Sequence, residues 1–167
     1  HCVTGVQTCA LPISRIAALP STISGVPLQK IYRPRNGGRG AAVRDGFQLA
    51  ISQWCGFLDV DLEVDFRWLR PTVERLQQGA HGVIGSRRYS SRDPRPDRVM
   101  YSLLYRAVAR RSLGLPVADS ECGFKFFRRD LILPVLAQTK DNGWFFDTEL
   151  VYRATKAGLG LERSEEH

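Results

Sequence analysis

The chain has 167 residues, of which 43% are hydrophobic and 25% are charged, and it carries a formal net charge of +7. This length suits one domain with a substantial core, and this composition excludes an intrinsically disordered chain. The positive charge favours anionic partners such as phosphates, nucleic acids or an acidic membrane surface, and no apolar run reaches the roughly 18 residues of a transmembrane helix.

The two ends of the sequence differ in character from the rest. Most of residues 1–14 resembles the translation of a common sequencing adapter, and residues 163–167 resemble the same adapter at its opposite end. A secretory signal is disfavoured because a basic n-region and a long apolar core are missing. We therefore expect both ends to be foreign and residues 15–162 to be part of a domain that lacks its first strands. Cys55 and Cys122 then remain, so no disulfide framework is expected.

Strands and helices are predicted to alternate along the remaining chain. We expect, in order, a strand at 28–32, a basic glycine-rich turn at 33–40, a helix at 41–52, a strand at 54–58, a helix at 65–77 and a strand at 82–86. There follow a polar loop at 89–97, a helix at 98–113, a turn and strand at 119–127, and helices at 129–138 and 145–157. This alternation is typical of an α/β fold with a mostly parallel sheet flanked by helices.

Three carboxylates follow the apolar run at 54–58. Asp59, Asp61 and Glu63 share one face if the strand continues, because strand side chains alternate. Open α/β sheets bind their ligands at the carboxyl ends of strands. Three oxygen ligands there suit a hard cation such as Mg²⁺ or Mn²⁺ that carries a phosphorylated substrate. The alternative, a strand end with solvated acids, stays open on these residues alone.

The segment 36–46 reads Asn-Gly-Gly-Arg-Gly-Ala-Ala-Val-Arg-Asp-Gly and is predicted to open a helix. Such a turn can present backbone N–H groups and Arg39 to a phosphate. It lacks the ending of a P-loop and the spacing of a dinucleotide-binding turn. Taken alone, the segment favours the simpler interpretation that Gly38 and Gly40 only permit a tight turn.

Five segments together resemble glycosyltransferase family 2, most closely the polyprenyl-phosphate sugar transferases of the dolichyl-phosphate mannose and glucose synthase type. They are Asn36–Gly46, Leu58-Asp-Val-Asp-Leu62, Gly85-Ser-Arg87, Asp119-x-x-Cys-Gly-Phe-Lys125 and Phe146-Asp-x-Glu-Leu150. The resemblance implies a GT-A fold, which is Rossmann-like, and transfer of a sugar from a nucleotide-diphosphate sugar to a dolichyl or undecaprenyl phosphate.

The resemblance also implies roles for individual residues. Asp59 and Asp61 would bind Mg²⁺ or Mn²⁺ at the donor diphosphate, with Glu63 as a third ligand, and the metal charge would stabilise the departing diphosphate. Asp61 and Arg87 would be catalytic, with the Arg87 guanidinium on the acceptor phosphate. That phosphate is already anionic at neutral pH, so no general base is required.

Further substrate contacts are expected beside these. The candidates are Gly38, Arg39, Gly40, Arg44, Asp59, Arg87, Lys125, Arg128, Asp147 and Glu149. Lys125 and Arg128 match positions near phosphates, although Arg128 is equally well explained as a surface charge. Asp147 and Glu149 either shape the acceptor side or cap a helix.

The helix predicted at 98–113 combines apolar residues with four arginines. A basic amphipathic helix of this kind can lie on an anionic membrane, although packing on the sheet is the favoured interpretation. We expect a peripheral protein at the cytoplasmic face of a membrane and no nucleic-acid partner.

Two other functions fit parts of the sequence. Phe57-Leu-Asp-Val-Asp61 also resembles the first motif of haloacid-dehalogenase phosphatases, in which Asp59 would be the nucleophile. That family expects Thr or Val at the position of Glu63. The net charge alone would suit a nucleic-acid binder, but the arginines are dispersed and no recognised module is present. A family 2 transferase with another acceptor is a third alternative.

Overall fold

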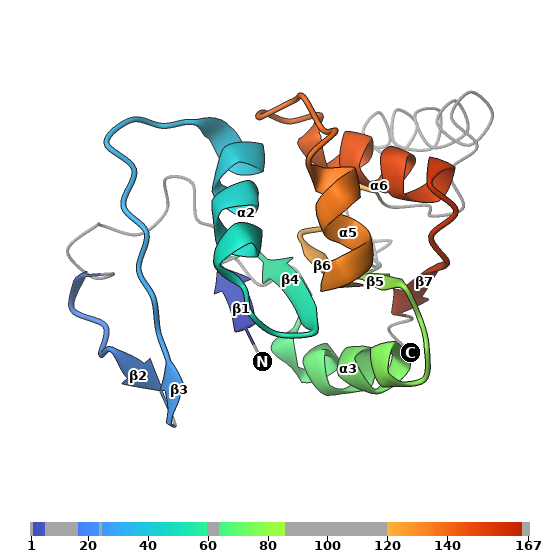
Figure 1. The fold of residues 1–167 in the computed structure, drawn as a ribbon. Helices are drawn as coiled ribbons and strands as arrows, with labels where there is room; N and C mark the ends of the chain where they lie inside the picture. Colours follow the sequence, from blue (N-terminus) through green and yellow to red (C-terminus); the bar gives the residue numbers. More distant parts are fainter. Residues whose placement is uncertain (1, 6–16, 24, 60–63, 86–119, 165–167) are drawn as a thin grey trace, which may run out of the picture.

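The computed structural model describes residues 2–5, 17–23, 25–59, 64–85 and 120–164 (Figure 1). Its strands are β1 (Cys2–Gly5), β2 (Thr22–Ile23), β3 (Val26–Pro27), β4 (Trp54–Leu58), β5 (Gly82–Gly85), β6 (Phe124–Arg128) and β7 (Leu161–Ser164). Its helices are α2 (Gly38–Leu49), the 3₁₀ turn η1 (Phe66–Trp68), α3 (Leu69–Gln77), α5 (Arg129–Leu136) and α6 (Phe146–Lys156).

Five of the strands form one mixed sheet in the order β1-β4-β6-β5-β7. β1 pairs with β4 and β5 pairs with β7 in parallel, whereas β6 lies antiparallel between β4 and β5. The predicted α/β class is confirmed. The sheet, predicted to be mostly parallel, is mixed, because β6 runs against both of its neighbours. β1 and β7 are the two edge strands of the sheet, and they pair with it through main-chain groups. The foreign origin of the chain ends stays a prediction.

Helices cover both faces of this sheet (Figure 1). On one face, α2, α5 and α6 enclose a core cluster that includes Phe47, Phe57, Phe127 and Leu150. On the other face, α3 packs on a second cluster that includes Phe124 and Phe126 together with Leu76 and Val83. Because successive strand residues point to opposite faces, β6 supplies side chains to both clusters.

Helix α2 forms because its buried residues share one face. Gly40, Val43, Gly46 and Phe47 recur at intervals of three and four residues, as an amphipathic helix requires. The helix begins at Gly38, three residues before the predicted start at 41, and therefore includes part of the glycine-rich turn. The glycine-rich turn is consequently a helix N-terminus that packs against other elements.

Most other predicted elements are confirmed, with one exception. The predicted helices at 65–77, 129–138 and 145–157 correspond to η1 with α3, α5 and α6. The strand predicted at 28–32 is wrong, because these residues pair with no strand; Lys30 Nζ instead donates to the carbonyl oxygens of Ala17 and Leu19. The predicted loop at 89–97 and helix at 98–113 lie outside the described residues.

Candidate active site

Asp59 follows β4 directly, at the carboxyl end of the strand. Its N–H donates to the carbonyl oxygen of Gly123 at 2.8 Å, and its side chain is 23% exposed. By strand alternation it lies on the same sheet face as Cys55 and Phe57, which is the face that α2 covers. The carboxyl end of β4, where ligand binding was predicted, therefore lies next to the N-terminus of α2.

Arg39, in the first turn of α2, joins two carboxylates. Its Nη1 lies 2.7 Å from Asp59 Oδ1, and its Nε lies 2.7 Å from Asp147 Oδ2 on α6. The second contact has the distance of an ion pair but not the direction of a hydrogen bond. The guanidinium also lies 5.3 Å from the ring centroid of Phe57, within the range of a cation–π interaction. Arg39 thus holds the end of β4 to the start of α6.

Lys125 is fully buried within the sheet. Its Nζ donates to Asp147 Oδ1 at 2.6 Å and to the carbonyl oxygen of Cys122 at 2.5 Å, and it lies 5.2 Å from the Phe57 ring centroid. A buried ammonium is costly without such partners. Lys125, Asp147, Arg39 and Asp59 therefore form one chain of two cations and two anions, hereafter the charge chain.

The sequence did not reveal that Asp147 bridges the two cations. Its side chain is 6% exposed, lies in the first turn of α6 and contacts both Arg39 and Lys125. The structure shows Asp147 in ion pairs and in no helix cap, and its predicted role on the acceptor side stays a prediction. The alternation of β6 was the available signal, since it places Lys125 on the sheet face that α6 covers.

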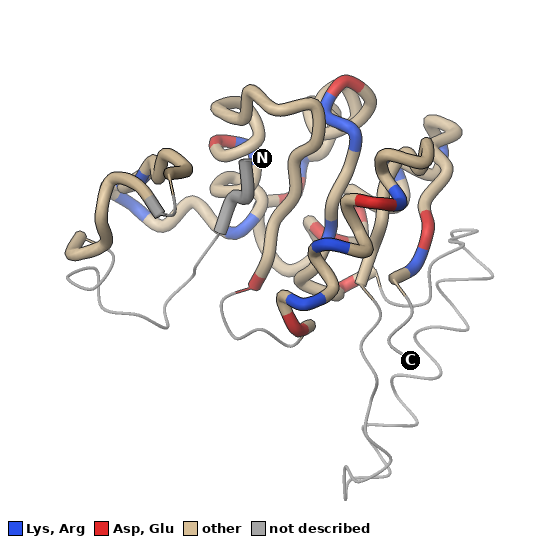
Figure 2. Tube along the Cα trace, turned by 90° about the horizontal axis from the view of Figure 1, so that it is seen from below, with Lys and Arg blue, Asp and Glu red and all other residues tan. Residues whose placement is uncertain are grey.

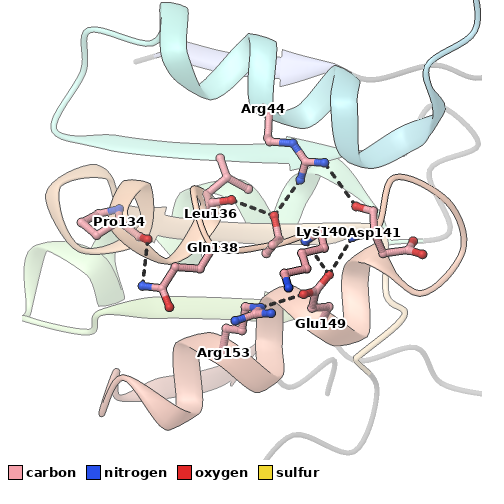
Figure 3. Close-up of polar contacts among 9 residues, drawn as sticks. Arg44, Pro134, Leu136, Gln138, Lys140, Asp141, Glu149 and Arg153 are labelled. Carbon is pink, nitrogen blue, oxygen red and sulfur yellow. Dashed lines mark hydrogen bonds and ion pairs between the residues drawn. The ribbon is translucent and has the colours of Figure 1, made fainter.

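Arg44 and Glu149 belong to a second polar group that holds the loop 139–145 (Figure 3). Arg44 donates to Thr139 Oγ1 at 2.6 Å, to the Asp141 carbonyl oxygen at 3.3 Å and to Asn142 Oδ1. Glu149 Oε2 accepts from the N–H groups of residues 140 and 141 at 2.9 and 2.8 Å, and Oε1 accepts from Arg153 Nε at 2.7 Å. These side chains fasten the loop to α2 and α6.

Gly38 and Gly40 allow that loop to approach α2 closely. A Cβ atom at Gly38, where φ is +81°, would lie 2.1 Å from the Asn142 carbonyl oxygen, and one at Gly40 would lie 2.6 Å from the Phe146 ring. Their N–H groups already donate within the protein, Gly38 to Asn36 Oδ1 at 2.9 Å and Gly40 to the Asn142 carbonyl oxygen at 3.0 Å. The structure therefore favours the packing interpretation of both glycines over a backbone phosphate cradle.

The structure does not bring Arg128 to this site. Arg128 pairs across the sheet with Trp54 at the start of β4, whereas Asp59 follows the other end of that strand. Its guanidinium pairs with Asp130 at 2.8 Å, on side chains that are 34% and 59% exposed. This placement favours the surface-charge interpretation of Arg128, and its predicted phosphate contact stays an untested prediction.

The predicted metal ligands are only partly covered by the described residues. Asp61, Glu63 and the predicted acceptor contact Arg87 lie outside them. Within the described ranges, no group of three or more His, Cys, Asp and Glu side chains gathers as a metal site would require. Asp59 contributes carboxylate oxygens, the donor type that Mg²⁺ and Mn²⁺ prefer, and one of these oxygens pairs with Arg39.

Replacing Glu149 with glutamine is expected to lower the free energy of unfolding by about 1.5–3 kcal/mol near neutral pH, because hydrogen bonds to a charged group are lost. Burial raises the pKa of the Glu149 carboxyl, but the bonds from Asp141, Arg153 and Lys140 outweigh it, and the net pKa lies below 4.5. A lowered folded pKa stabilises the protein above pH 4.5, and this stabilisation is lost as the pH falls through the folded pKa.

Urea unfolding at neutral pH and below pH 4.5 measures this difference between wild type and variant. Glu74→Gln is the matched control, because Glu74 forms an i,i+4 pair with Arg70 on side chains that are 53% and 89% exposed. The control should change stability by at most about 0.5 kcal/mol. Equal losses in the two variants would show that the Glu149 contacts do not fasten the loop.

The basic residues do not collect into one stripe within the described part of the chain. Figure 2 shows Lys and Arg spread over several elements and interspersed with Asp and Glu. Among the described residues, no helix is both long and apolar enough to span a bilayer.

Comparison with known proteins identifies the family. The profile described as glycosyl transferase family 2 matches residues 16–134. Glycosyltransferase AglD of Haloferax volcanii is 36% identical over 130 residues, which are 73% of this chain and 20% of that protein. A dolichyl-phosphate beta-glucosyltransferase of Dictyostelium discoideum is 25% identical over 166 residues, 93% of this chain and 49% of that protein.

A third relative is the undecaprenyl-phosphate 4-deoxy-4-formamido-L-arabinose transferase of Pseudomonas paraeruginosa, 34% identical over 113 residues, 68% of this chain and 33% of that protein. The chain thus spans between 20% and 49% of the length of these three relatives. The profile match and the helix-flanked mixed sheet confirm the predicted GT-A fold and disfavour the dehalogenase alternative. The chain therefore belongs to glycosyl transferase family 2.

Proposed function

We propose that the complete protein transfers a sugar from a nucleotide-diphosphate sugar to a polyprenyl phosphate. The observation that carries this proposal is the charge chain at the carboxyl end of β4, in a chain that belongs to family 2. Support for the acceptor comes from the names of two relatives, a dolichyl-phosphate beta-glucosyltransferase and an undecaprenyl-phosphate sugar transferase. Both names specify a polyprenyl phosphate.

In this proposal, the charge chain orients the donor. Asp59 lies on the donor side, and Arg39 places a guanidinium beside it, where an additional phosphate oxygen could be bound. Lys125 pairs with Asp147, and Asp147 pairs with Arg39. The buried part of the charge chain thus positions Arg39 and, through it, Asp59. An oxygen of the acceptor phosphate attacks the anomeric carbon, the bond to the donor diphosphate breaks, and the nucleoside diphosphate leaves with the bonding electrons.

The proposed cofactor is Mg²⁺ or Mn²⁺. Asp59, with Asp61 and Glu63 as the predicted further ligands, would hold the cation. When bound, the cation would supply positive charge that stabilises the departing diphosphate. Arg87 is the proposed contact for the acceptor phosphate, because a guanidinium fork matches phosphate oxygens.

Replacing Asp61 with alanine is expected to lower the transfer rate about 100-fold or more, the order of loss when one charge-stabilising group is removed from an active site. The measurement follows a radiolabelled sugar from its nucleotide donor into lipid-extractable product. Asp65→Asn is the matched control, because Asp65 pairs with Arg67 at 2.6 Å and lies outside the charge chain. Normal turnover by the Asp61 variant would overturn the metal assignment, and consumption of donor without a labelled lipid would indicate another acceptor.

We further propose that the protein acts as a peripheral protein at the cytoplasmic face of a membrane. The basic amphipathic pattern at 98–113 supports contact with an anionic surface. A polyprenyl phosphate resides in the bilayer, so an enzyme that uses it must reach the membrane–water interface. Loss of membrane binding when the arginines at 98–113 are replaced by glutamine would support this role for the helix.

A further inference from the structure

Two aromatic side chains are exposed beside the candidate active site. Trp144 is 98% exposed, more than any other large hydrophobic side chain among the described residues, and Phe145 is 51% exposed. Phe146, the next residue, is fully buried in the core against α2. Adjacent exposed apolar side chains are a feature of surfaces that contact a membrane or another molecule.

These rings project from a loop that other elements hold in place. Asp141 Oδ1 accepts from the Gly143 N–H at 2.7 Å, and the Asn142 carbonyl oxygen accepts from the Gly40 N–H at 3.0 Å. Glu149 and Arg44 fasten the preceding residues of the loop (Figure 3). The loop that carries the rings is thus fixed by hydrogen bonds, so binding through the rings costs little further conformational entropy.

The loop lies at the same end of the molecule as the charge chain. It runs into α6 beside the N-terminus of α2 (Figure 1), and Asp147 follows Phe145 by two residues. Gly38 and Gly40 contact the loop, and Arg39 between them contacts Asp59. Any surface that covers Trp144 would therefore come close to the carboxyl end of β4.

Exposed basic side chains occur in the loop that carries the rings and in the turn before α2. Lys140 in the loop and Arg35 in the turn before α2 are both exposed, and neither side chain has an ion-pair partner among the described residues. Arg35 is three residues from Gly38, which contacts the loop. A combination of exposed aromatic rings and exposed cations is typical of surfaces that contact the headgroup region of an anionic bilayer.

We propose that Trp144 and Phe145 form a membrane-docking surface that inserts into the interface of an anionic bilayer, with Arg35 and Lys140 on the lipid headgroups. The rings have amphipathic or apolar character suited to headgroup depth. This inference deepens the proposed function and rests on it, because docking here brings the end of β4 to the place where a lipid-linked phosphate emerges. Its residues lie outside the range 98–113 that was predicted to form a basic amphipathic helix.

The test uses the full-length protein and sedimentation with phosphatidylcholine vesicles that contain or lack phosphatidylglycerol. Replacing both Trp144 and Phe145 with serine is expected to weaken binding to the anionic vesicles about tenfold, which equals about 1.4 kcal/mol. Phe66→Ser is the matched control, because Phe66 is 67% exposed and lies in η1 on the other side of the sheet. Unchanged unfolding temperatures in both variants show that the fold is intact.

Tryptophan fluorescence assigns the contact to one residue. Brominated lipids should quench the tryptophan emission of the wild type but not that of Trp144→Phe, a variant that keeps an apolar ring. The remaining tryptophans, Trp54 and Trp68, are half-buried and should not be quenched. Vesicle binding by the double variant equal to that of the wild type, or equal binding to neutral and anionic vesicles, would overturn the proposal. Self-association that disappears in the double variant, without vesicle binding, would overturn it in favour of a second copy of the chain.

A transfer assay with a water-soluble short-chain prenyl phosphate separates this inference from the proposed function. If the protein transfers sugar but the double variant still binds vesicles like the wild type, the docking surface fails and the function stands. If no acceptor is glycosylated while the wild type docks through Trp144, the proposed function fails and the surface stands.

Discussion

Replacing Lys125 with methionine is expected to lower the free energy of unfolding by about 3–5 kcal/mol, the usual cost when one partner of a buried ion pair is removed. Methionine fills a similar volume but leaves Asp147 Oδ1, 2.6 Å from the lost ammonium, without its partner. The Cys122 carbonyl oxygen loses a hydrogen bond as well. Asp147 still pairs with Arg39 in this variant, so the loss of unfolding free energy should not exceed this range.

A double-mutant cycle measures how much of that loss belongs to the pair. Urea unfolding is compared for Lys125→Met, Asp147→Asn and the double variant, and the double variant should lose less than the two single variants together. Arg128→Met is the matched control on the same strand, because its pair with Asp130 is exposed and should contribute at most about 1 kcal/mol. A Lys125 variant as stable as the Arg128 variant would show that the charge chain does not stabilise the fold.

Replacing Gly123 with alanine is expected to displace Asp59 and to reduce both stability and transfer. A Cβ atom at Gly123 would lie 1.9 Å from Asp59 Oδ2 and 2.7 Å from Asp59 Cβ. Rotation of the carboxylate relieves only the first overlap, so the backbone at the end of β4 must also move. We expect a loss of about 1–3 kcal/mol in unfolding free energy, as for other overpacked sites, and a lower transfer rate because Asp59 leaves Arg39.

Gly143→Ala provides the matched control in the loop before α6. The nearest atom to a Cβ there is Asp141 Oδ1 at 3.6 Å, an ordinary contact distance, so stability should change by no more than about 0.5 kcal/mol. Thermal unfolding and the radiolabel transfer assay are measured for both variants. If Gly123→Ala matches Gly143→Ala in both measurements, the close packing of Gly123 on Asp59 is not a feature of the protein.

Long periodic segments with clear stop signals were predictable from the sequence. α6 was predicted because its apolar residues recur at helical spacing and Gly158, whose φ is +79°, ends the helix region. The prediction of a strand at 28–32 was wrong, because a short alternation of apolar and polar residues forms a strand only where a partner strand is available. The antiparallel direction of β6 was not predicted, since strand direction depends on how the chain returns to the sheet.

The candidate site was predictable as a set of residue types but not as a connected structure. Asp59, Arg39, Lys125 and Asp147 were each candidates from motif resemblance, although Lys125 and Asp147 lie far along the chain from the other two. Arg44 and Glu149 were candidates for the same reason, and the structure uses them to hold the loop 139–145. A sequence motif gives the residue type at a position, but not which side chains that residue contacts in the fold.

The sequence by itself determined the α/β alternation, the family resemblance and the acidic end of β4, because these depend on local periodicity and on the order of short motifs. Only the tertiary structure decided that Arg39 pairs with Asp59 and Asp147, that Lys125 is buried beneath them, and that Arg128 lies at the opposite end of the strands from Asp59. The physical reason is that a side chain's partners depend on strand register and on helix packing, which join residues that are distant in the chain.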